Sequence, residues 1–311
     1  MHQPVMLEAV VELLQVREMG CYVDGTLGSG GHAAAVLSRL GPSGRLLGID
    51  RDADALVRCG KRLAPFGDRF VALRGNYRDM EKLVKQVGVS EVDGVVLDFG
   101  VSSEQLDTPE RGFSFRASGP LDMRMDQSAR LTAAEIVNSW PESSLADIFF
   151  RYGEERGARR AARAIVLRRE ERSFSETLDL AAVLEKAIGR RHGTAAGRRH
   201  PATRCFQAIR MVVNDELAGI DEGLCAALNL LRVGGRMAVI TFHSLEDRKV
   251  KVFFRSHAGR EVSLIEGGSR WEGVLPKVRL VTKKALEATA AECLENPRSR
   301  SARLRVAERI A

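Results

Sequence analysis

A glycine-rich segment near the N-terminus and an aspartate that follows it have the residue types and spacing of a nucleoside-binding site. Residues 24–32 read DGTLGSGGH, and Asp50 lies twenty positions after Gly30. Glycines let the backbone turn sharply and approach a ligand closely, and a helix that begins after Gly31 would offer free amide groups. A carboxylate at Asp50 could accept hydrogen bonds from both ribose hydroxyls. The pattern favours a bound nucleoside over its alternative, a tight turn that happens to be rich in glycine.

The acidic start of this segment indicates which nucleoside it would bind. Its pattern, D-x-T-x-G-x-G, differs from the G-x-G-x-x-G of dinucleotide sites, and the sequence has no G-x-x-x-x-G-K-[ST] loop. It resembles the first motif of class I S-adenosylmethionine (SAM) methyltransferases, with Thr26 where a glycine is common. Because SAM carries a positive sulfonium and no phosphate, carboxylates beside the loop would attract it.

Two more candidate side chains follow apolar runs. Tyr77 comes after the run 70–73, where an aromatic ring could stack on adenine or simply pack. Asp98 ends the run 92–98. Open α/β sheets bind ligands at the carboxyl ends of their parallel strands, so we favour a site role for Asp98 over a capping role.

These residues need a parallel sheet to bring them together, and the order of apolar segments predicts one. Short apolar runs alternate with helical patterns at the spacing of βαβ units, the pattern stops after residue 99, and residues 131–200 have helical spacing only. We therefore predict a Rossmann-like α/β domain, of the class I methyltransferase type with a mostly parallel seven-stranded sheet, formed by residues 1–107 and 203–311. Residues 108–202 form an inserted helical domain. The later elements are predicted as a long helix over 206–231 that ends at the glycines 233–235, a strand over 236–241, a helix over 245–254 and a strand pair over 278–282 and 304–308.

Composition limits the class of protein. The chain has 311 residues, 44% of them hydrophobic, and a formal charge of +7, which mildly favours a polyanionic partner. No apolar run approaches the ~20 residues of a membrane span, and the N-terminus does not resemble a secretory signal, so we expect a cytoplasmic protein. Five cysteines without a CxxC pair predict neither disulfides nor a metal site. Those in helical patterns are expected as core thiols: Cys59, Cys205 and Cys225.

Several long motifs resemble those of one family, the bacterial 16S rRNA (cytosine-N4)-methyltransferases, also called the small-subunit methyltransferase H family. The resemblance covers nearly the whole chain. It rests on the motifs at 2–7, 26–32, 48–52, 100–107, 111–115, 119–125, 152–155, 200–208, 242–248 and 296–301. It implies a SAM-dependent enzyme that methylates the exocyclic amine of a cytidine in the decoding region (P site) of 16S rRNA, with the small ribosomal subunit as partner. The sequence leaves the oligomeric state open between a monomer and a homodimer. The resemblance also implies that the SAM contacts are Gly30, Gly31, His32, Asp50, Tyr77, Asp98 and Gln105.

The chemistry of this reaction gives Asp98 a second candidate role. The N4 amine of cytosine is a weak nucleophile because its lone pair is delocalised into the ring. An acceptor that holds the N–H would return electron density to nitrogen, and the proton leaves as charge builds, so a strong base is not required. Many amino-methyltransferases place an Asp/Asn-Pro-Pro-aromatic motif here, whereas this chain has Asp98-Phe99-Gly100. Asp98 either accepts from N4 or orients SAM, and the sequence leaves both open.

The substrate side is predicted from aromatic and basic residues. The target base must leave its stack to reach the pocket. Phe113 and Phe115 alternate with Arg111 and Arg116 in a loop that could stack bases and bind phosphate, or fold over an apolar cluster. Further predicted substrate contacts are Arg124, Arg204, His243 and Ser244. Capping is the alternative for the last two.

The predicted insertion is basic, with 15 Arg and Lys against 7 Asp and Glu over residues 151–210. Such a charge excess is either a solvated face or a phosphate-binding surface. The basic residues at 190–191 and 198–199, with His192 and His200, are one candidate cluster. A second is the C-terminal series at 298, 300, 303 and 305, which could equally be the polar face of an edge strand. The sequence fits two other functions less well: an RNA-binding assembly factor without catalysis, and a small-molecule methyltransferase.

Overall fold

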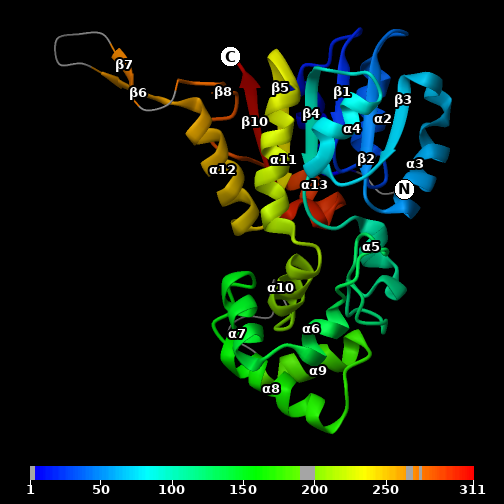
Figure 1. Ribbon diagram of the computed structural model, residues 1–311, viewed down its shortest axis with the longest axis vertical. Helices are drawn as coiled ribbons and strands as arrows, with labels where there is room; N and C mark the ends of the chain where they lie inside the picture. Colours follow the sequence, from blue (N-terminus) through cyan, green and yellow to red (C-terminus); the bar gives the residue numbers. More distant parts are fainter. Residues whose placement is uncertain (1–3, 190–199, 264–268, 273–274) are drawn as a thin grey trace. The chain divides into compact units, whose positions relative to one another are not determined.

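The computed structural model describes residues 4–189, 200–263, 269–272 and 275–311, and the chain folds into two compact units (Figure 1). Unit 1 consists of Met1–Gly100 and Leu217–Ala311, and unit 2 of Val101–Glu216. The predicted insertion, residues 108–202, lies inside unit 2, which extends further at both ends. Among the described residues, none of the helices has the length and apolar character needed to span a bilayer.

Unit 1 is built on a twisted sheet with the strand order β3-β2-β1-β4-β5-β10-β8, and the short β9 pairs with β10. The five strands from β3 to β5 are parallel, whereas β10 is antiparallel to β5 and to β8. The strands are β1 (Cys21–Asp24), β2 (Arg45–Asp50), β3 (Phe70–Arg74), β4 (Val92–Asp98), β5 (Leu231–Thr241), β8 (Val278–Leu280), β9 (Leu286–Glu287) and β10 (Arg303–Arg309), with β6 (Arg260–Ser263) and β7 (Ser269–Glu272) as a separate hairpin.

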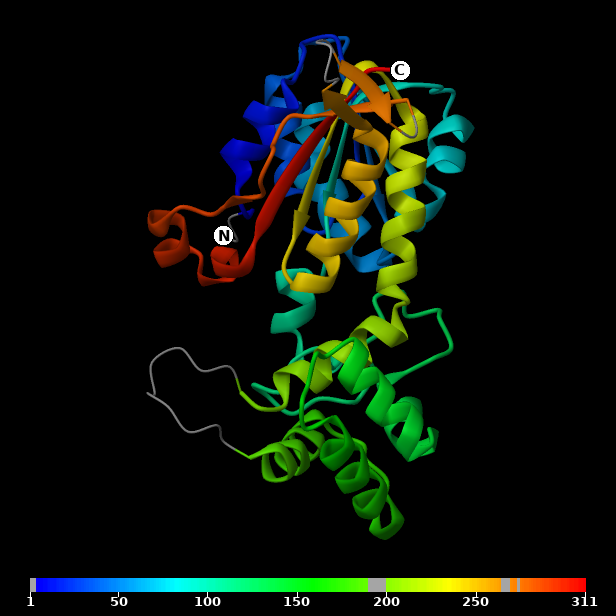
Figure 2. The ribbon, with the colours of Figure 1, turned by 90° about the vertical axis from the view of Figure 1, so that its left-hand side faces the viewer.

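Helices cover both faces of this sheet because successive side chains of a strand point to opposite sides. In β2, Leu46 packs into a core with α1 and α2, while Leu47 packs into a second core with α4, α11 and α12. The two layers are visible as the blue helices on one side and the yellow and orange helices on the other (Figure 2). The helices of unit 1 are α1 (Leu7–Leu14), α2 (Gly31–Arg39), α3 (Ala53–Leu63), α4 (Met80–Gln86), α11 (Glu216–Leu230), α12 (Ser244–Ala258) and α13 (Ala290–Glu295).

Unit 2 has a helical core of its own. Its central side chains come from the loop before α6 and from the helices, and include Met123, Leu145, Phe149 and Leu180, all essentially inaccessible to solvent. The helices are α5 (Ser103–Asp107), α6 (Ala133–Ser139), α7 (Glu142–Arg151), α8 (Ala158–Glu171), α9 (Thr177–Ile188) and α10 (Thr203–Val213).

The predicted mostly parallel sheet is confirmed, with eight strands in the described residues instead of seven, because the short β9 pairs with β10. Strand β4 has the predicted bounds, 92–98. The late strand pair is also confirmed as β8 and β10. The long helix over 206–231 is wrong, because the chain breaks between α10 and α11 at Asp215, whose φ is +47°. The glycines 233–235 do not end the second helix, since β5 begins at Leu231. Cys225 is exposed rather than buried, because α11 turns its neighbours Leu224 and Ala226 toward the core.

Candidate cofactor site at the carboxyl edge of the sheet

The parallel strands of unit 1 bring three predicted carboxylates to one edge of the sheet. β1 ends at Asp24, β2 at Asp50 and β4 at Asp98, and these strands are neighbours in register. β5, the next parallel strand, ends at Thr241 and leads to His243 at the start of α12. The sheet therefore places a row of titratable groups where open α/β sheets bind ligands.

The glycine-rich loop between β1 and α2 has the backbone shape that the sequence predicted. Gly30 has a φ of +74°, and a Cβ there would lie 2.9 Å from Cys59 Sγ. A Cβ on Gly31 would lie 2.1 Å from Pro4 Cγ. Both positions therefore exclude larger residues, so the glycines are required by the loop itself. Their predicted contact with SAM stays a prediction.

Asp50 holds this loop in place. Its Oδ2 accepts a hydrogen bond from the Gly28 N–H (2.8 Å), and its Oδ1 accepts one from the Asp52 N–H (2.8 Å). Each carboxylate oxygen has a further lone pair, so the group can still accept from ribose hydroxyls. Burial raises the pKa of Asp50, against the two backbone hydrogen bonds that lower it.

Asp24 and Asp98 form the buried acidic centre of the edge. Burial, and then the nearby charge of Asp50, raise the pKa of Asp24 to about 7 although the Thr26 N–H donates to its Oδ1 (3.1 Å). The pKa of Asp98 lies well above its usual value because of burial and the charges of Asp24 and Glu246. Within the described residues, Asp98 Oδ1 is buried and has no hydrogen-bond partner. An unsatisfied buried oxygen of this kind points to a missing donor.

Thr26 explains the departure from glycine at the first position of the motif. Its Oγ1 accepts a hydrogen bond from the Asp98 N–H (2.6 Å), which ties the β1 loop to the end of β4. A glycine at this position would lack that acceptor.

His32 lies beside the acidic centre on the first turn of α2. Its Nε2 is 3.0 Å from the Val5 carbonyl oxygen, and its Nδ1 is 3.9 Å from Asp98 Oδ2. Because a carbonyl oxygen only accepts, Nε2 carries a proton and Nδ1 is the nitrogen that faces Asp98. The fold therefore places His32 beside Asp98, and the contact of His32 with SAM stays a prediction.

Tyr77 packs against α11 at the end of β3. Its ring centroid is 5.5 Å from that of Phe99, and Cβ atoms on Gly219 or Gly223 would clash with the tyrosine side chain. These contacts agree with the packing role of Tyr77, and its stacking on adenine stays a prediction.

Glu246 is a member of this edge that the sequence did not single out. It is 1% exposed, and its Oε2 accepts from the Phe242 N–H (2.8 Å) and the His243 N–H (3.3 Å). Its Oε1 lies 3.0 Å from His243 Nε2, and its own N–H donates to His243 Nδ1 (3.4 Å). The two residues form a capping box at the start of α12, so the capping alternative for His243 is realised. The spacing H-x-x-E was the signal, since a capping box pairs the N-cap with the third helical residue. Ser244 is the first residue of α12.

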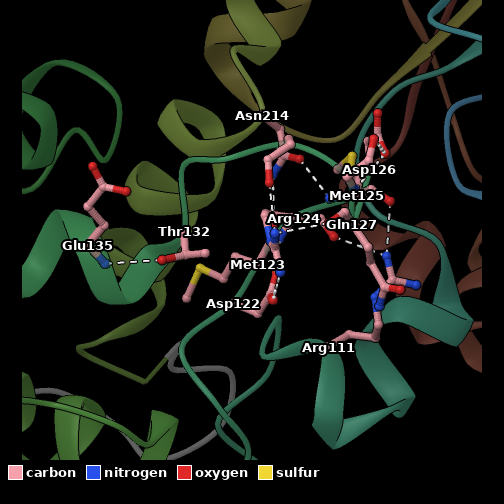
Figure 3. Close-up of polar contacts among 12 residues, drawn as sticks. Arg111, Asp122, Met123, Arg124, Met125, Asp126, Gln127, Thr132, Glu135 and Asn214 are labelled. Atoms are coloured by element: carbon pink, nitrogen blue, oxygen red, sulfur yellow. Dashed lines mark hydrogen bonds and ion pairs between the residues drawn. The ribbon is translucent and has the colours of Figure 1, made fainter.

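Most of the predicted substrate residues of unit 2 hold unit 2 together. Arg111, 7% exposed, donates to the carbonyl oxygens of Arg124 and Met125 (both 3.0 Å) (Figure 3). Arg124 binds both oxygens of Asp122 (2.9 and 2.6 Å) and the carbonyl oxygens of Gln127 and Ala129. These guanidinium groups therefore hold the loop 111–129 in its fold, and their contact with RNA stays a prediction.

The aromatic loop also agrees with its second interpretation. Phe113 is 6% exposed inside the core of unit 2, and the Phe115 ring lies 4.7 Å from Phe206 and 4.8 Å from His200. Burial leaves the faces of the Phe113 ring in contact with protein, and stacking of Phe113 on an unstacked base stays a prediction. The loop had no periodicity from which this burial could be read.

Gln105 and Arg204 make local contacts. The side chain of Gln105 accepts from the Ser102 N–H (3.1 Å) and completes the capping box of α5, so its contact with SAM is still a prediction. Arg204 donates to the Glu154 carbonyl oxygen (2.9 Å) while its side chain stays 41% exposed.

The two predicted basic clusters have different outcomes. Arg190, Arg191, His192, Arg198 and Arg199 lie outside the described residues. In the C-terminal series, Arg303 and Arg305 both bind Asp247 of α12. These two arginines therefore brace β10 against α12.

Comparison with known proteins assigns the chain to a family. Residues 1–310 match the MraW methylase family. The chain belongs to this family. The predicted methyltransferase activity and the recognised family are thereby confirmed, as is SAM as the methyl donor of this MraW methylase.

Individual relatives agree with this MraW assignment. The Ribosomal RNA small subunit methyltransferase H of Carboxydothermus hydrogenoformans is 48% identical over 309 residues, which are 99% of this chain and 98% of that protein. The protein of the same name from Geobacter sulfurreducens is 49% identical over 309 residues and covers 99% of each chain. A crystal structure of an rRNA methylase from Streptococcus thermophilus gives a TM-score of 0.44 at 10% identity, over 100% of this chain and 99% of that one.

The sheet edge fits the donor of an MraW methylase in charge and shape. SAM carries positive charge, and Asp24, Asp50 and Asp98 gather at one edge, where the described residues supply no hydrogen-bond partner for Asp98 Oδ1. The loop at Gly30 presents backbone without a side chain. A cationic ligand would favour the ionised carboxylates and offset their burial.

Proposed function

We propose that this protein transfers a methyl group from SAM to the N4 amine of a cytidine in the decoding region of 16S rRNA. The rRNA substrate class is carried over from the relatives, which are named as small-subunit rRNA methyltransferases. The observation that carries the chemistry is Asp98 Oδ1, a buried acceptor with no partner in the described residues at the carboxyl edge of the sheet. An exocyclic amine is a donor that would satisfy it.

The residues of unit 1 divide the work as follows. Bound SAM would supply an electrophilic methyl group on a sulfonium. Asp50 would accept from the ribose hydroxyls, and Asp24 would offset the positive charge. Asp98 would accept the N–H of N4, which returns electron density to the nitrogen, and would take the proton as positive charge builds there. Thr26 positions Asp98 through the backbone hydrogen bond described above.

Unit 2 would recognise the RNA. It is a helical body inserted between β4 and β5, and residues 151–210 within it hold 15 Arg and Lys against 7 Asp and Glu. The substrate would be the small ribosomal subunit in the cytoplasm. Arg204 and His200, at the surface of unit 2, are the predicted residues with side chains still partly accessible.

Mass mapping of the modified nucleoside tests this proposal. Small subunits from cells that lack the enzyme are incubated with SAM and the purified protein, and 16S rRNA is digested and analysed. We expect one added methyl group on N4 of a single cytidine. Methylation at carbon 5, at a ribose, or at no position would contradict the assignment.

The variant Asp98→Ala separates the two roles of Asp98. An alanine removes both acceptor oxygens, whereas an asparagine would keep one that can accept from N4. If Asp98 accepts from N4, kcat falls by about 100-fold or more while the Kd for SAM changes little. If Asp98 only orients SAM, the Kd rises and kcat at saturating SAM is preserved. Glu91→Ala is a matched control, because Glu91 is exposed just before β4.

A further inference from the structure

The arginines of helix α8 in unit 2 form two groups with different surroundings. The buried side of the helix consists of Ala158, Ala161, Ala162 and Ile165. Arg159 and Arg163, one turn apart, lie on the opposite, exposed side. Arg160 is exposed as well, although it donates to the Ile188 carbonyl oxygen (3.5 Å), and the exposed Arg156 precedes the helix. A cationic stripe therefore runs along the first half of α8.

The arginines of the second half are already engaged within unit 2. Arg168 binds Asp179 (2.8 Å) and lies over the Phe174 ring. Arg169 donates to the carbonyl oxygens of Val137 and Trp140 (2.9 and 2.8 Å). Within the part of the chain that the structure describes, no such hydrogen bond or ion pair involves the side chain of Arg156, Arg159 or Arg163. These three arginines therefore differ from Arg168 and Arg169, whose partners lie within unit 2.

The charges at the start of α8 oppose the helix dipole. The first turn holds Arg159 and Arg160 and no acidic residue, whereas the last turn holds Arg168 and Arg169 beside two glutamates. Partial positive charge at a helix N-terminus disfavours cations there, and partial negative charge disfavours anions at the C-terminus. The arginines of the first half thus do not serve the stability of the helix, in contrast to Arg168 and Arg169.

We propose that the exposed stripe of Arg156, Arg159, Arg160 and Arg163 binds the phosphate backbone of the RNA substrate. The inference rests on the proposed function and names the surface by which unit 2 would hold RNA. Guanidinium groups match phosphate oxygens in pairs, and residues four apart on a helix are separated by about 6 Å along its axis, so successive groups can contact one strand. These contacts position the RNA without reading its sequence.

Salt dependence of binding tests the stripe directly. Affinity for unmodified small subunits and for naked 16S rRNA is measured between 50 and 300 mM KCl with the wild-type protein and Arg159→Gln/Arg163→Gln. The slope of log K against log[salt] is negative, and each lost phosphate contact reduces its magnitude by roughly 0.7–0.9. For the double variant we expect the magnitude of the slope to decrease by roughly 1.5. We expect its affinity at 100 mM KCl to fall roughly tenfold for both the small subunit and naked 16S rRNA. Lys82→Gln/Lys85→Gln on α4, with the same charge change, should leave the slope unchanged.

Three further readouts keep the outcomes distinct. The melting temperature of Arg159→Gln/Arg163→Gln should equal or exceed that of the wild type, because glutamine has a similar helix propensity and two unfavourable charges are removed. A clear fall would show that the arginines are structural and would overturn the proposal. An unchanged salt slope would overturn it too. Loss of affinity for subunits but not for naked rRNA would point to an acidic protein partner instead, again against the proposal.

The failure of the stripe can be told apart from the failure of the proposed function. If the wild-type protein methylates rRNA and binds SAM while the double variant keeps its salt slope, only the stripe is wrong. If the wild-type protein neither methylates nor binds rRNA, the proposed function itself is wrong. The Kd for SAM of the double variant should match that of the wild type in either case.

Discussion

At the residue scale, the carboxyl group of Asp24 links the charge of the site to pH. Its pKa of about 7 in the folded protein exceeds the 3.8 of an unperturbed aspartate, so the folded state binds the extra proton. The stability associated with this group is therefore complete below about pH 3.8 and is lost as the pH rises through 7. A cation bound at the site has the opposite effect on the protonation of Asp24, because it favours the ionised carboxylate.

SAM affinity should therefore rise with pH through the titration of Asp24. We expect the wild-type protein to bind SAM more tightly than Asp24→Asn at pH 8, and the difference to shrink by up to tenfold per pH unit below 7. Calorimetric titration at pH 5.5, 7 and 8 measures both proteins. Comparing them cancels the titration of SAM itself. A constant ratio of the two affinities would contradict the buried, proton-binding Asp24.

Thiol reactivity offers a second check at this scale. Burial, with the charges of Asp24 and Asp50, raises the pKa of Cys59 to about 12, and its Sγ donates to the Gly28 carbonyl oxygen. Cys225 is exposed on α11. Because the thiolate is the reactive form, iodoacetamide at pH 8 should label Cys225 first and leave Cys59 unlabelled until denaturant is added. Peptide mass spectrometry measures the order, and early labelling of Cys59 would show that the loop opens.

At the element scale, Asn214 fixes the break between α10 and α11. It donates to the Met123 carbonyl oxygen (2.7 Å), accepts from the Met125 N–H (2.8 Å) and is 7% exposed (Figure 3). The Asn214 side chain thus supplies hydrogen-bond partners for backbone groups of the loop at 123–125. This junction lets the chain leave the helix direction at Asp215.

Asn214→Ala should lower the free energy of unfolding of unit 2 by about 2–4 kcal/mol, because buried amide and carbonyl groups lose their partners. Denaturant titration can follow Trp140 in unit 2 on a Trp271→Phe background, since the chain has two tryptophans. Ser128→Ala is the control, because Ser128 is exposed and bonds only to Asp126. A loss below about 0.5 kcal/mol would mean that water replaces the asparagine.

The elements that the sequence predicted well are those with a clear period. The runs at β1, β2 and β4 end in Asp24, Asp50 and Asp98, and parallel pairing then brings these residues to one edge. The aperiodic segment before α6 gave no such guide, so the burial of Phe113 and the internal bonds of Arg124 could not be foreseen. The break at Asp215 was missed because it depends on a contact with residues about 90 positions earlier.

At the scale of the whole molecule, each unit has a separate core. Leu180 lies at the centre of unit 2, while Leu47 lies in the core beside β2 and α11 in unit 1. A change in one core removes apolar contacts from that unit alone. The units are therefore expected to respond separately to core substitutions.

Leu180→Ala should lower the stability of unit 2 by about 2–5 kcal/mol, from lost burial and the cavity left behind. The Kd for SAM at 25 °C should stay within about twofold of the wild type while unit 2 remains folded, because the acidic edge belongs to unit 1. Trp140 fluorescence reports the first quantity and calorimetry the second. A large change in SAM affinity would show that the core of unit 2 shapes the cofactor site.

The insertion of unit 2 between β4 and β5 has a consequence for synthesis of the chain. Leu97 and Val239 are partners in neighbouring parallel strands although about 140 residues separate them. At ~5–20 residues per second, a ribosome needs about 7–30 s to deliver the second strand after the first. During that time the growing polypeptide carries an unpaired apolar strand, which is a template for unwanted pairing with another chain. Nascent molecules would depend on a chaperone in this interval, and completed ones would not.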